Sequence, residues 1–276
     1  MTTSIDMQAV ADLLLEVGRD IVMPRFRCLR AEDVAEKTSH KDLVTVADEE
    51  AEAFLTPRLE ALLAGSQAVG EEAVGRNPTL MGRLREPGLS WLIDPIDGTA
   101  SFAVGSPFFA TMVALVRDGD AVASWILDPP SGRLYMAEKG AGAWLREPDG
   151  SLHRLHMPSP PSLAHLSGVA NFGISDRELA RRMAYRIDQT AGMLNLRCSG
   201  QEYPAMALGQ IHWGIYGRNI PWDHAPGTLL VCEAGGIARR LNGQDYRAAD
   251  PPGGSPLVAA CGEDQWNWLK TGIFDP

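Results

Sequence analysis

The sequence predicts a layered α/β fold, and three patterns support this prediction. Apolar residues recur at helical spacing near the N-terminus, short strands separated by turns fill the middle, and helices alternate with strands in the last third. Helices placed before and between strands pack against the faces of sheets and form layers. At 276 residues the chain can bury a substantial core, as one large domain or two smaller ones.

The first part of the chain is predicted to contain two helices and a short strand. Apolar side chains at helical spacing indicate a helix over 4–22, which Pro24 is expected to end. A polar loop should connect it to a second helix over 49–63, with Thr45 or a neighbour near the N-cap. Residues 67–70 form a strand candidate that runs directly into two glutamates.

The middle of the chain changes to the period of β-structure. Strands are expected over 109–117, 122–127, 134–138 and 143–145, with turns at 118–120 and 128–132. This series predicts an antiparallel meander. A proline-rich break, Pro158–Pro161, is the candidate boundary between two halves, 1–157 and 158–276, that form one compact unit.

The second half alternates between the two kinds of element. Strands are expected over 166–170, 193–197, 211–216 and 257–260, and helices over 176–188, 202–208, 223–234 and 266–269. Two glycines after residue 234 are suited to closing the third of these helices.

Composition and charge exclude several classes of function. The net charge of −10 disfavours nonspecific binding to nucleic acid or to an anionic membrane. No apolar run approaches the roughly 20 residues of a membrane helix, and the first residues lack the pattern of a secretory signal. The four cysteines are far apart and form no C-x-x-C pair, which favours free thiols in a reducing cytoplasm. We therefore expect a cytoplasmic protein.

The segment W-L-I-D-P-I-D-G-T at residues 91–99 is the most informative part of the sequence. Its first three residues predict the buried end of a strand, and Pro95 predicts a stiff turn out of it. Asp94, the carbonyl of Ile96 and Asp97 can then converge on one point. Two carboxylates and a carbonyl are ligands that suit a hard cation such as Mg²⁺.

The end of the same segment predicts an anion site. Gly98 permits close approach of the backbone, and a helix that begins at Thr99 would leave free N–H groups at its start. A metal site beside an anion site indicates phosphate chemistry. Taken alone, Asp97 followed by Gly98 is also an ordinary turn dipeptide.

Acidic residues elsewhere in the chain are expected to join this segment. They are Asp48, Glu71, Glu72 and Asp223, and all but Asp48 lie where an element is predicted to begin or end. If all six carboxylates share one cleft, they repel one another, and two or three Mg²⁺ ions would resolve this repulsion. Alternatives remain for three residues: Asp223 as a helix N-cap, Glu72 as a solvated acid, and Lys37 as a surface lysine instead of a metal-site or phosphate contact.

Three motifs in order carry a resemblance to a known family. Gly70-Glu71-Glu72, D-P-I-D-G-T at 94–99, and P-W-D-H-A-P-G at 221–227 followed by E-A-G-G at 233–236 resemble the inositol monophosphatase family. The resemblance implies an α/β/α/β/α sandwich of the inositol monophosphatase and fructose-1,6-bisphosphatase type. It also implies a Mg²⁺-dependent, lithium-sensitive phosphomonoesterase that acts on a small phosphorylated metabolite, in a family that often forms homodimers.

The resemblance also implies a role for each site residue. Glu71, Asp94 and the Ile96 carbonyl would hold a first Mg²⁺, and Glu71 would contact a third. Asp94, Asp97 and Asp223 would hold a second Mg²⁺. Thr99, held by Asp48, would position the attacking water, so that Thr99, Asp48 and Glu71 form the catalytic set. The backbone of Gly98 and Thr99 would bind phosphate.

The substrate half departs from the family pattern. Gln201 and Glu202 stand where a turn of small residues is usual, and Tyr216 stands where inositol-specific members carry a glutamate. We expect these three side chains to contact the substrate together with Asp97, Gly98, Thr99 and Asp223. Inositol phosphate, histidinol phosphate, fructose 1,6-bisphosphate and 3′-phosphorylated adenosine nucleotides stay open as substrates. Arg197 and Arg218 are candidates for a second phosphate site, and a catalytically silent metal- or partner-binding protein is the alternative without enzyme activity.

Overall fold

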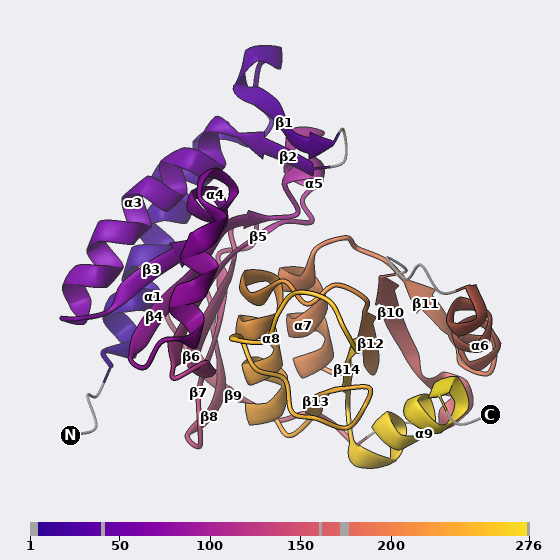
Figure 1. Cartoon of the computed structure of the whole chain (residues 1–276). Coiled ribbons are helices and arrows are strands. Elements are labelled where there is room, and N and C mark those ends of the chain that lie inside the picture. Colours follow the sequence, from indigo (N-terminus) through magenta and orange to yellow (C-terminus); the bar gives the residue numbers. More distant parts are fainter. Residues whose placement is uncertain (1–4, 40–41, 160–161, 172–176, 275–276) are drawn as a thin grey trace.

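The chain forms five alternating layers of helices and sheets in a computed structural model that describes residues 5–39, 42–159, 162–171 and 177–274 (Figure 1). The outer helices α1 (Met7–Val17) and α3 (Val46–Leu62) cover one face of a seven-stranded sheet. Helices α7 (Ser199–Ala207) and α8 (Pro221–Glu233) separate this sheet from a five-stranded one. Helices α6 (Arg177–Ile187) and α9 (Glu263–Phe274) form the last layer. The predicted α/β/α/β/α sandwich is confirmed.

The seven-stranded sheet contains the predicted meander. In sheet order its strands are β3 (Gln67–Gly70), β4 (Leu89–Asp97), β5 (Ala110–Arg117), β6 (Asp120–Asp128), β7 (Arg133–Glu138), β8 (Gly142–Arg146) and β9 (Leu152–Leu155). Only β3 and β4 pair in parallel, and all other neighbours are antiparallel. Strand β9 was not predicted, because only its last residue, Leu155, is buried and the strand has no apolar face.

The five-stranded sheet is formed by the second half of the chain. Its order is β11 (Gly192–Leu194), β10 (Ser167–Asn171), β12 (Trp213–Tyr216), β14 (Leu257–Ala260) and β13 (Ile237–Arg240). The central strand β12 pairs in parallel with β10 and antiparallel with β14. Strand β13 was not predicted, and β11 ends three residues before the expected Arg197. Pro160 and Pro161 of the candidate boundary lie outside the described residues.

The N-terminal part differs from the prediction in two places. Pro24 does not end the first helix, because a π-helical turn over Gly18–Val22 leads into α2 (Met23–Arg25), where the proline sits in a first turn. The predicted polar loop is a hairpin of β1 (Val34–Ser39) and β2 (Asp42–Thr45). Apolar periodicity did not predict these strands, because most of their side chains are polar. Among the described residues, the two strands pair only with each other.

The short helices connect these elements. They are η2 (Ala31–Asp33), α4 (Glu71–Arg76), η3 (Pro78–Arg85), α5 (Thr99–Ala103) and η4 (Leu163–His165). Two of them, α4 and α5, begin at the ends of β3 and β4, so they start at the same edge of the seven-stranded sheet.

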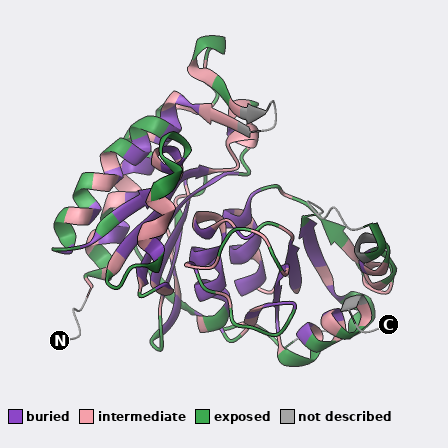
Figure 2. Ribbon diagram, viewed as in Figure 1, coloured by how far each residue is buried: buried purple, intermediate pink, exposed green. Residues whose placement is uncertain are grey.

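The core is divided between the layers (Figure 2). One apolar cluster, which includes Leu14, Leu55, Trp91 and Trp125, fills the space between the outer helices and the seven-stranded sheet. Helix α8 is buried along most of its length, because it lies between two sheets. Among the described residues no helix is long and apolar enough to span a membrane.

Candidate active site

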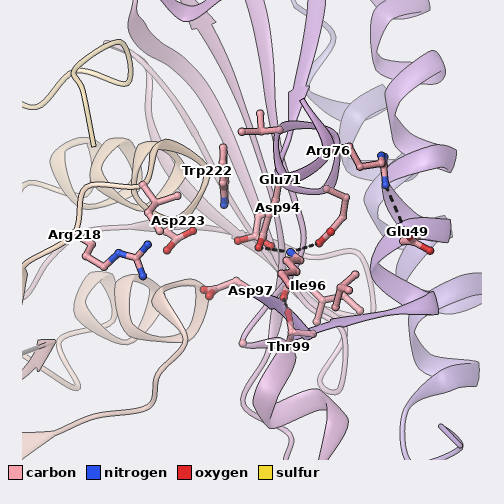
Figure 3. A pocket seen from close by; sticks show the side chains of 17 residues that line it. Glu49, Glu71, Arg76, Asp94, Ile96, Asp97, Thr99, Arg218, Trp222 and Asp223 are labelled. Atoms are coloured by element: carbon pink, nitrogen blue, oxygen red, sulfur yellow. Dashed lines mark hydrogen bonds and ion pairs between the residues drawn. The ribbon is translucent and has the colours of Figure 1, made fainter. Parts of the chain in front are cut away.

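A cavity of about 500 Å³ opens between the seven-stranded sheet and the start of α8 (Figure 3). Its walls come from the β1–β2 hairpin, α4, the end of β4, the start of α5 and the segment that enters α8. The acidic residues on its walls are Glu49, Glu71, Glu72, Asp94, Asp97 and Asp223, and the basic ones are Lys37, Arg76 and Arg218. The structure therefore brings the three sequence motifs to one place.

Strand β4 carries the first carboxylates into the cavity. The prediction that the chain turns out of the strand at Pro95 is wrong. The strand continues to Asp97, and its register opposite β5 is irregular between Asp94 and Asp97. A hydrogen bond of 2.9 Å from the Thr111 hydroxyl to the Pro95 carbonyl holds this bulge to β5. A bulge of this kind redirects side chains without ending the strand.

Gly98 links this strand to α5, and two features of the backbone require a glycine at this position. Its φ of 88° lies in the left-handed region, where residues with a Cβ are disfavoured. A Cβ at this position would also lie 2.8 Å from the carbonyl oxygen of Phe108. Helix α5 begins at the next residue, so the first N–H groups of a helix lie beside the carboxylates, as the sequence predicted.

Asp97 is held from the opposite layer by the start of α7. The Ser199 hydroxyl donates to Asp97 Oδ2 at 2.8 Å, and the backbone N–H of Gly200 donates to the same oxygen. Burial raises the pKa of Asp97 to about 6, although these donors lower it. Sequence reasoning missed Ser199, because it placed the start of this helix at residue 202 instead of 199.

Asp94 and Asp223 are carboxylates that lie close to other carboxylates. Burial raises the pKa of both, and the carboxylates around them raise it further. Asp94 is only 1% exposed, and its Oδ1 has no hydrogen-bond partner. An ionised carboxylate in such surroundings is unfavourable unless a positive charge joins it.

Lys37 supplies one positive charge at the edge of this group. Its ammonium lies 2.8 Å from Glu71 Oε1 and 2.6 Å from Glu72 Oε1. Burial lowers the pKa of Lys37, but the two carboxylates outweigh burial and raise it overall. Burial raises the pKa of Glu72 to about 7. Neither Lys37 nor Glu72 is thus the solvated surface residue that the sequence left as an alternative.

Thr99 and Asp48 form a hydrogen-bonded pair beside the carboxylates. The Thr99 hydroxyl lies 3.1 Å from Asp48 Oδ1 and 2.9 Å from the Ile96 carbonyl. Asp48 is buried at the start of α3, where its Oδ2 accepts bonds from the N–H and hydroxyl of Thr45 in a capping box. Burial raises the pKa of Asp48 to about 7. The capping box confirms the predicted N-cap at Thr45.

The donor set suits a hard cation, although it is not assembled around one. Carboxylates and the Ile96 carbonyl line the cavity, and the orphaned Asp94 oxygen points to an absent positive partner. Across the described part of the chain, no three His, Cys, Asp or Glu side chains lie at metal-binding spacing. To bind a divalent cation, these side chains would have to come closer together.

Asp223 enters the cavity from the first turn of α8. The helix begins at Pro221 with Ile220 as its N-cap, so Asp223 is not the N-cap that the sequence left open. Pro226 lies inside the helix, which continues through it to Glu233. The two sheets that enclose α8 stabilise the helix despite the missing N–H.

The three predicted substrate contacts from the second half do not lie on the cavity wall. The Gln201 amide donates to the Phe109 carbonyl at 2.9 Å, and Glu202 accepts from the Leu196 N–H at 3.1 Å. Tyr216 is 2% exposed. Its ring packs between Tyr203 and His224, with centroids 5.2 and 4.8 Å away. These polar groups are turned into the interior between layers, and the prediction that they contact substrate is not matched by their placement.

Comparison with known proteins gives a consistent assignment. A statistical model of the inositol monophosphatase family matches residues 6–271. The inositol-1-monophosphatase of Mycobacterium leprae is 31% identical over 232 residues, which span 82% of this chain and 76% of that protein. The fructose-1,6-bisphosphatase/inositol-1-monophosphatase of Thermotoga maritima is 25% identical over 220 residues, 79% of each chain.

Solved structures share the fold. The extragenic suppressor protein SuhB of Bartonella henselae superposes with a TM-score of 0.79 at 22% identity, over 98% of each chain. An inositol monophosphatase of Thermotoga maritima gives 0.77 at 24% identity, over 96% of each chain. Together with the match over nearly the whole sequence, these findings show that the chain belongs to the inositol monophosphatase family.

Proposed function

We propose that this protein is a Mg²⁺-dependent phosphatase that hydrolyses a small phosphate monoester. Membership of the inositol monophosphatase family supports a phosphatase acting on a phosphorylated small molecule. The observation that carries the proposal is the convergence of Glu71, Asp94, Asp97 and Asp223 on one cavity, beside the hydrogen-bonded pair of Thr99 and Asp48.

The acidic residues are suited to hold the metal. Asp94, Asp97 and Asp223, with Glu71 and the Ile96 carbonyl, would provide its oxygen ligands. Two bound Mg²⁺ ions would neutralise the phosphate and stabilise the attacking and leaving oxygens of an in-line displacement. The carboxylates would then be ionised despite the burial that raises their pKa values.

Thr99 and Asp48 are suited to handle the proton of the attacking water. When the Thr99 hydroxyl donates to Asp48 Oδ1, its lone pairs are left to accept a hydrogen bond from water. Water then attacks phosphorus, the bond from phosphorus to the ester oxygen breaks, and the alcohol leaves with a proton. Positioned proton transfer of this kind contributes about 10²- to 10⁴-fold to a rate.

The start of α5 is suited to bind the phosphate oxygens. The N–H groups of Ser101 and Phe102 donate to the Gly98 carbonyl, whereas those of Thr99 and Ala100, the first two residues of this helix, have no partner within it. Together with Lys37, they would place donors around a bound phosphate, near the carboxylates that would hold the metal.

The identity of the alcohol is the least determined part of the proposal. The relatives named above are an inositol-1-monophosphatase and a fructose-1,6-bisphosphatase/inositol-1-monophosphatase. Tyr216 replaces the glutamate of inositol-specific members and is buried away from the cavity, which disfavours inositol monophosphate as the principal substrate. Histidinol phosphate, fructose 1,6-bisphosphate and 3′-phosphoadenosine nucleotides stay as candidates. We further propose lithium sensitivity, a cytoplasmic location and a homodimer.

Phosphate release from a panel of these compounds tests the proposal. We expect release in the presence of millimolar Mg²⁺, none after chelation with EDTA, and inhibition by Li⁺. A catalytically silent protein would release no phosphate from any compound under any of these conditions, and that result would refute the enzyme assignment.

A further inference from the structure

Among the described residues, three cationic side chains line the cavity, and one of them has no carboxylate within ion-pair distance. Lys37 is bound by Glu71 and Glu72, and Arg76 lies 3.5 Å from Glu49 and 3.7 Å from Glu52. The guanidinium of Arg218 makes neither an ion pair nor a hydrogen bond with the described residues, although its charge acts on Asp223. Figure 3 shows it beside Asp223, on the opposite side of the carboxylates from Arg76 and Glu49.

The backbone that carries Arg218 is fixed by buried groups. His224 Nε2 lies 2.7 Å from the Arg218 carbonyl oxygen, and His224 Nδ1 lies 3.0 Å from the Tyr203 hydroxyl. His224 is 4% exposed, and burial lowers its pKa to about 4, so the neutral ring donates through Nε2 and accepts through Nδ1. The next residue, Asn219, donates to the carbonyls of Gly253 and Ser255 at 3.1 Å.

This anchoring separates Arg218 from an ordinary surface arginine. The side chain is exposed, but its Cα is held in place from the interior, at the rim of the cavity. A guanidinium offers a planar set of donors that matches the geometry of a phosphate or carboxylate. A site prepared in this way loses less entropy when an anion binds, because the backbone is already ordered.

The charge of the cavity explains why such a residue would be needed. Six acidic and three basic residues line it, and two of the three basic residues already have acidic neighbours. Bound Mg²⁺ would be matched by the carboxylates and by the transferred phosphate, so a second anion on the alcohol moiety would need a separate cation. Arg218 is the lining cation that has this capacity.

We propose that Arg218 binds a second anionic group, a phosphate or a carboxylate, on the alcohol moiety of the substrate. The inference rests on the proposed phosphatase function and narrows its substrate class to phosphomonoesters that carry another negative charge. It follows that the enzyme should prefer such compounds over uncharged analogues of the same shape.

Matched pairs of compounds test this preference. One pair is fructose 1,6-bisphosphate and fructose 1-phosphate, which differ by a second phosphate. The other is 2-phosphoglycerate and glycerol 2-phosphate, which differ by a carboxylate. We expect kcat/KM to be higher for the member that carries the additional anionic group in at least one pair, and the pair that shows the larger difference identifies the anion.

Substitution of Arg218 should abolish this discrimination. We expect Arg218→Ala to reduce the kcat/KM ratio within the preferred pair by roughly 10-fold or more, and Arg218→Lys to retain part of it, since lysine keeps the charge but loses the paired donors. Arg181→Ala on α6 removes the same charge from an exposed position and should leave both the ratio and the rates unchanged.

The outcomes separate this inference from the proposed function. Hydrolysis without discrimination in the wild type would overturn the assignment of Arg218 and leave the phosphatase intact. An equal loss of kcat/KM for both members of a pair would also overturn it, because Arg218 would then support Asp223 or the transferred phosphate. No phosphate release from any of the four compounds or from the wider panel would refute both proposals.

Discussion

The two walls of the cavity are built in different ways. The wall at the end of β4 takes Asp94, Asp97 and Thr99 from one short segment, so neighbours in sequence are neighbours in the site. The facing wall is formed by the segment that leads from β12 into α8 and includes Arg218, Trp222 and Asp223. The expected contacts Gln201, Glu202 and Tyr216 lie behind this wall, in α7 and β12, and Arg218 reaches the cavity from the loop before α8. The sequence therefore predicts site residues that lie within one short segment, but it does not predict which side chains from the second half reach the cavity.

The largest effect should come from the first wall. We expect Asp97→Asn to lower kcat by about 10³-fold or more, because a metal ligand contributes several kcal/mol to the transition state. The melting temperature should change little, since the substitution removes a buried charge. Assays of phosphate release and thermal unfolding check both statements. Asp188→Asn, at an exposed position on the opposite outer layer, is the control and should retain full activity.

Loss of the Thr99 hydroxyl should have the next largest effect. We expect Thr99→Ala to lower kcat by about 10²-fold or more. The attacking water would lose its hydrogen-bond acceptor, and Asp48 would no longer be connected to that water through the hydroxyl. Thr99→Ser keeps the hydroxyl and should retain most of the activity. If the serine variant were as slow as the alanine variant, the hydroxyl would not be the active group.

A substitution in α8, behind the second wall, should change the stability of the protein. A Cβ at Gly227 of α8 would lie 1.9 Å from the Tyr203 ring, which holds His224 and with it the backbone of Arg218. We expect Gly227→Ala to destabilise the protein by about 1–3 kcal/mol, or roughly 3–10 °C in melting temperature. Gly82→Ala, where a Cβ meets no atom within 4 Å, should be neutral. Equal melting temperatures for the two variants would contradict this packing.

The metal-free protein should lose stability as pH rises. Burial raises the pKa of Asp48 to about 7 and that of Asp97 to about 6, so the folded state keeps protons that the unfolded chain releases near pH 4. These groups contribute their full stabilisation of the folded state below about pH 4, and this stabilisation is lost as the pH rises to about 7. We expect the melting temperature in EDTA to be about 3 °C or more lower near pH 7.5 than near pH 5.

Magnesium should counteract this loss. Because ligands bind the metal as carboxylates, we expect excess Mg²⁺ to raise the melting temperature more near pH 7.5 than near pH 5. A stabilisation by Mg²⁺ that is the same at both values would mean that these buried carboxylates are not its ligands.

The smallest effect should come from Tyr216. Its hydroxyl lies in the interior, so Tyr216→Phe is expected to change kcat/KM by less than about 3-fold for every substrate, within the range of an indirect effect. Steady-state kinetics on the compound pairs above measure this. A selective loss for one substrate would restore Tyr216 as a substrate contact and would move the specificity site away from Arg218.

The sequence by itself determined the layers and the chemistry of the first wall. Helical and strand periodicity identified most elements, and the D-P-I-D-G-T segment identified the acidic turn, because its residues act within a few positions of one another. It failed for strands that lack a clear apolar pattern. Most side chains of the β1–β2 hairpin are polar, and β9 and β13 lie at sheet edges.

Only the tertiary structure decided how distant residues meet. It placed Lys37 between Glu71 and Glu72, set Ser199 against Asp97 and buried Tyr216. It also left Arg218 at the cavity rim with no ion pair to any residue that the structure describes. The physical reason is that a side chain between two packed layers can face either layer. Which way it points depends on the packing of α7 and α8 between the sheets, and no spacing along the chain records that choice.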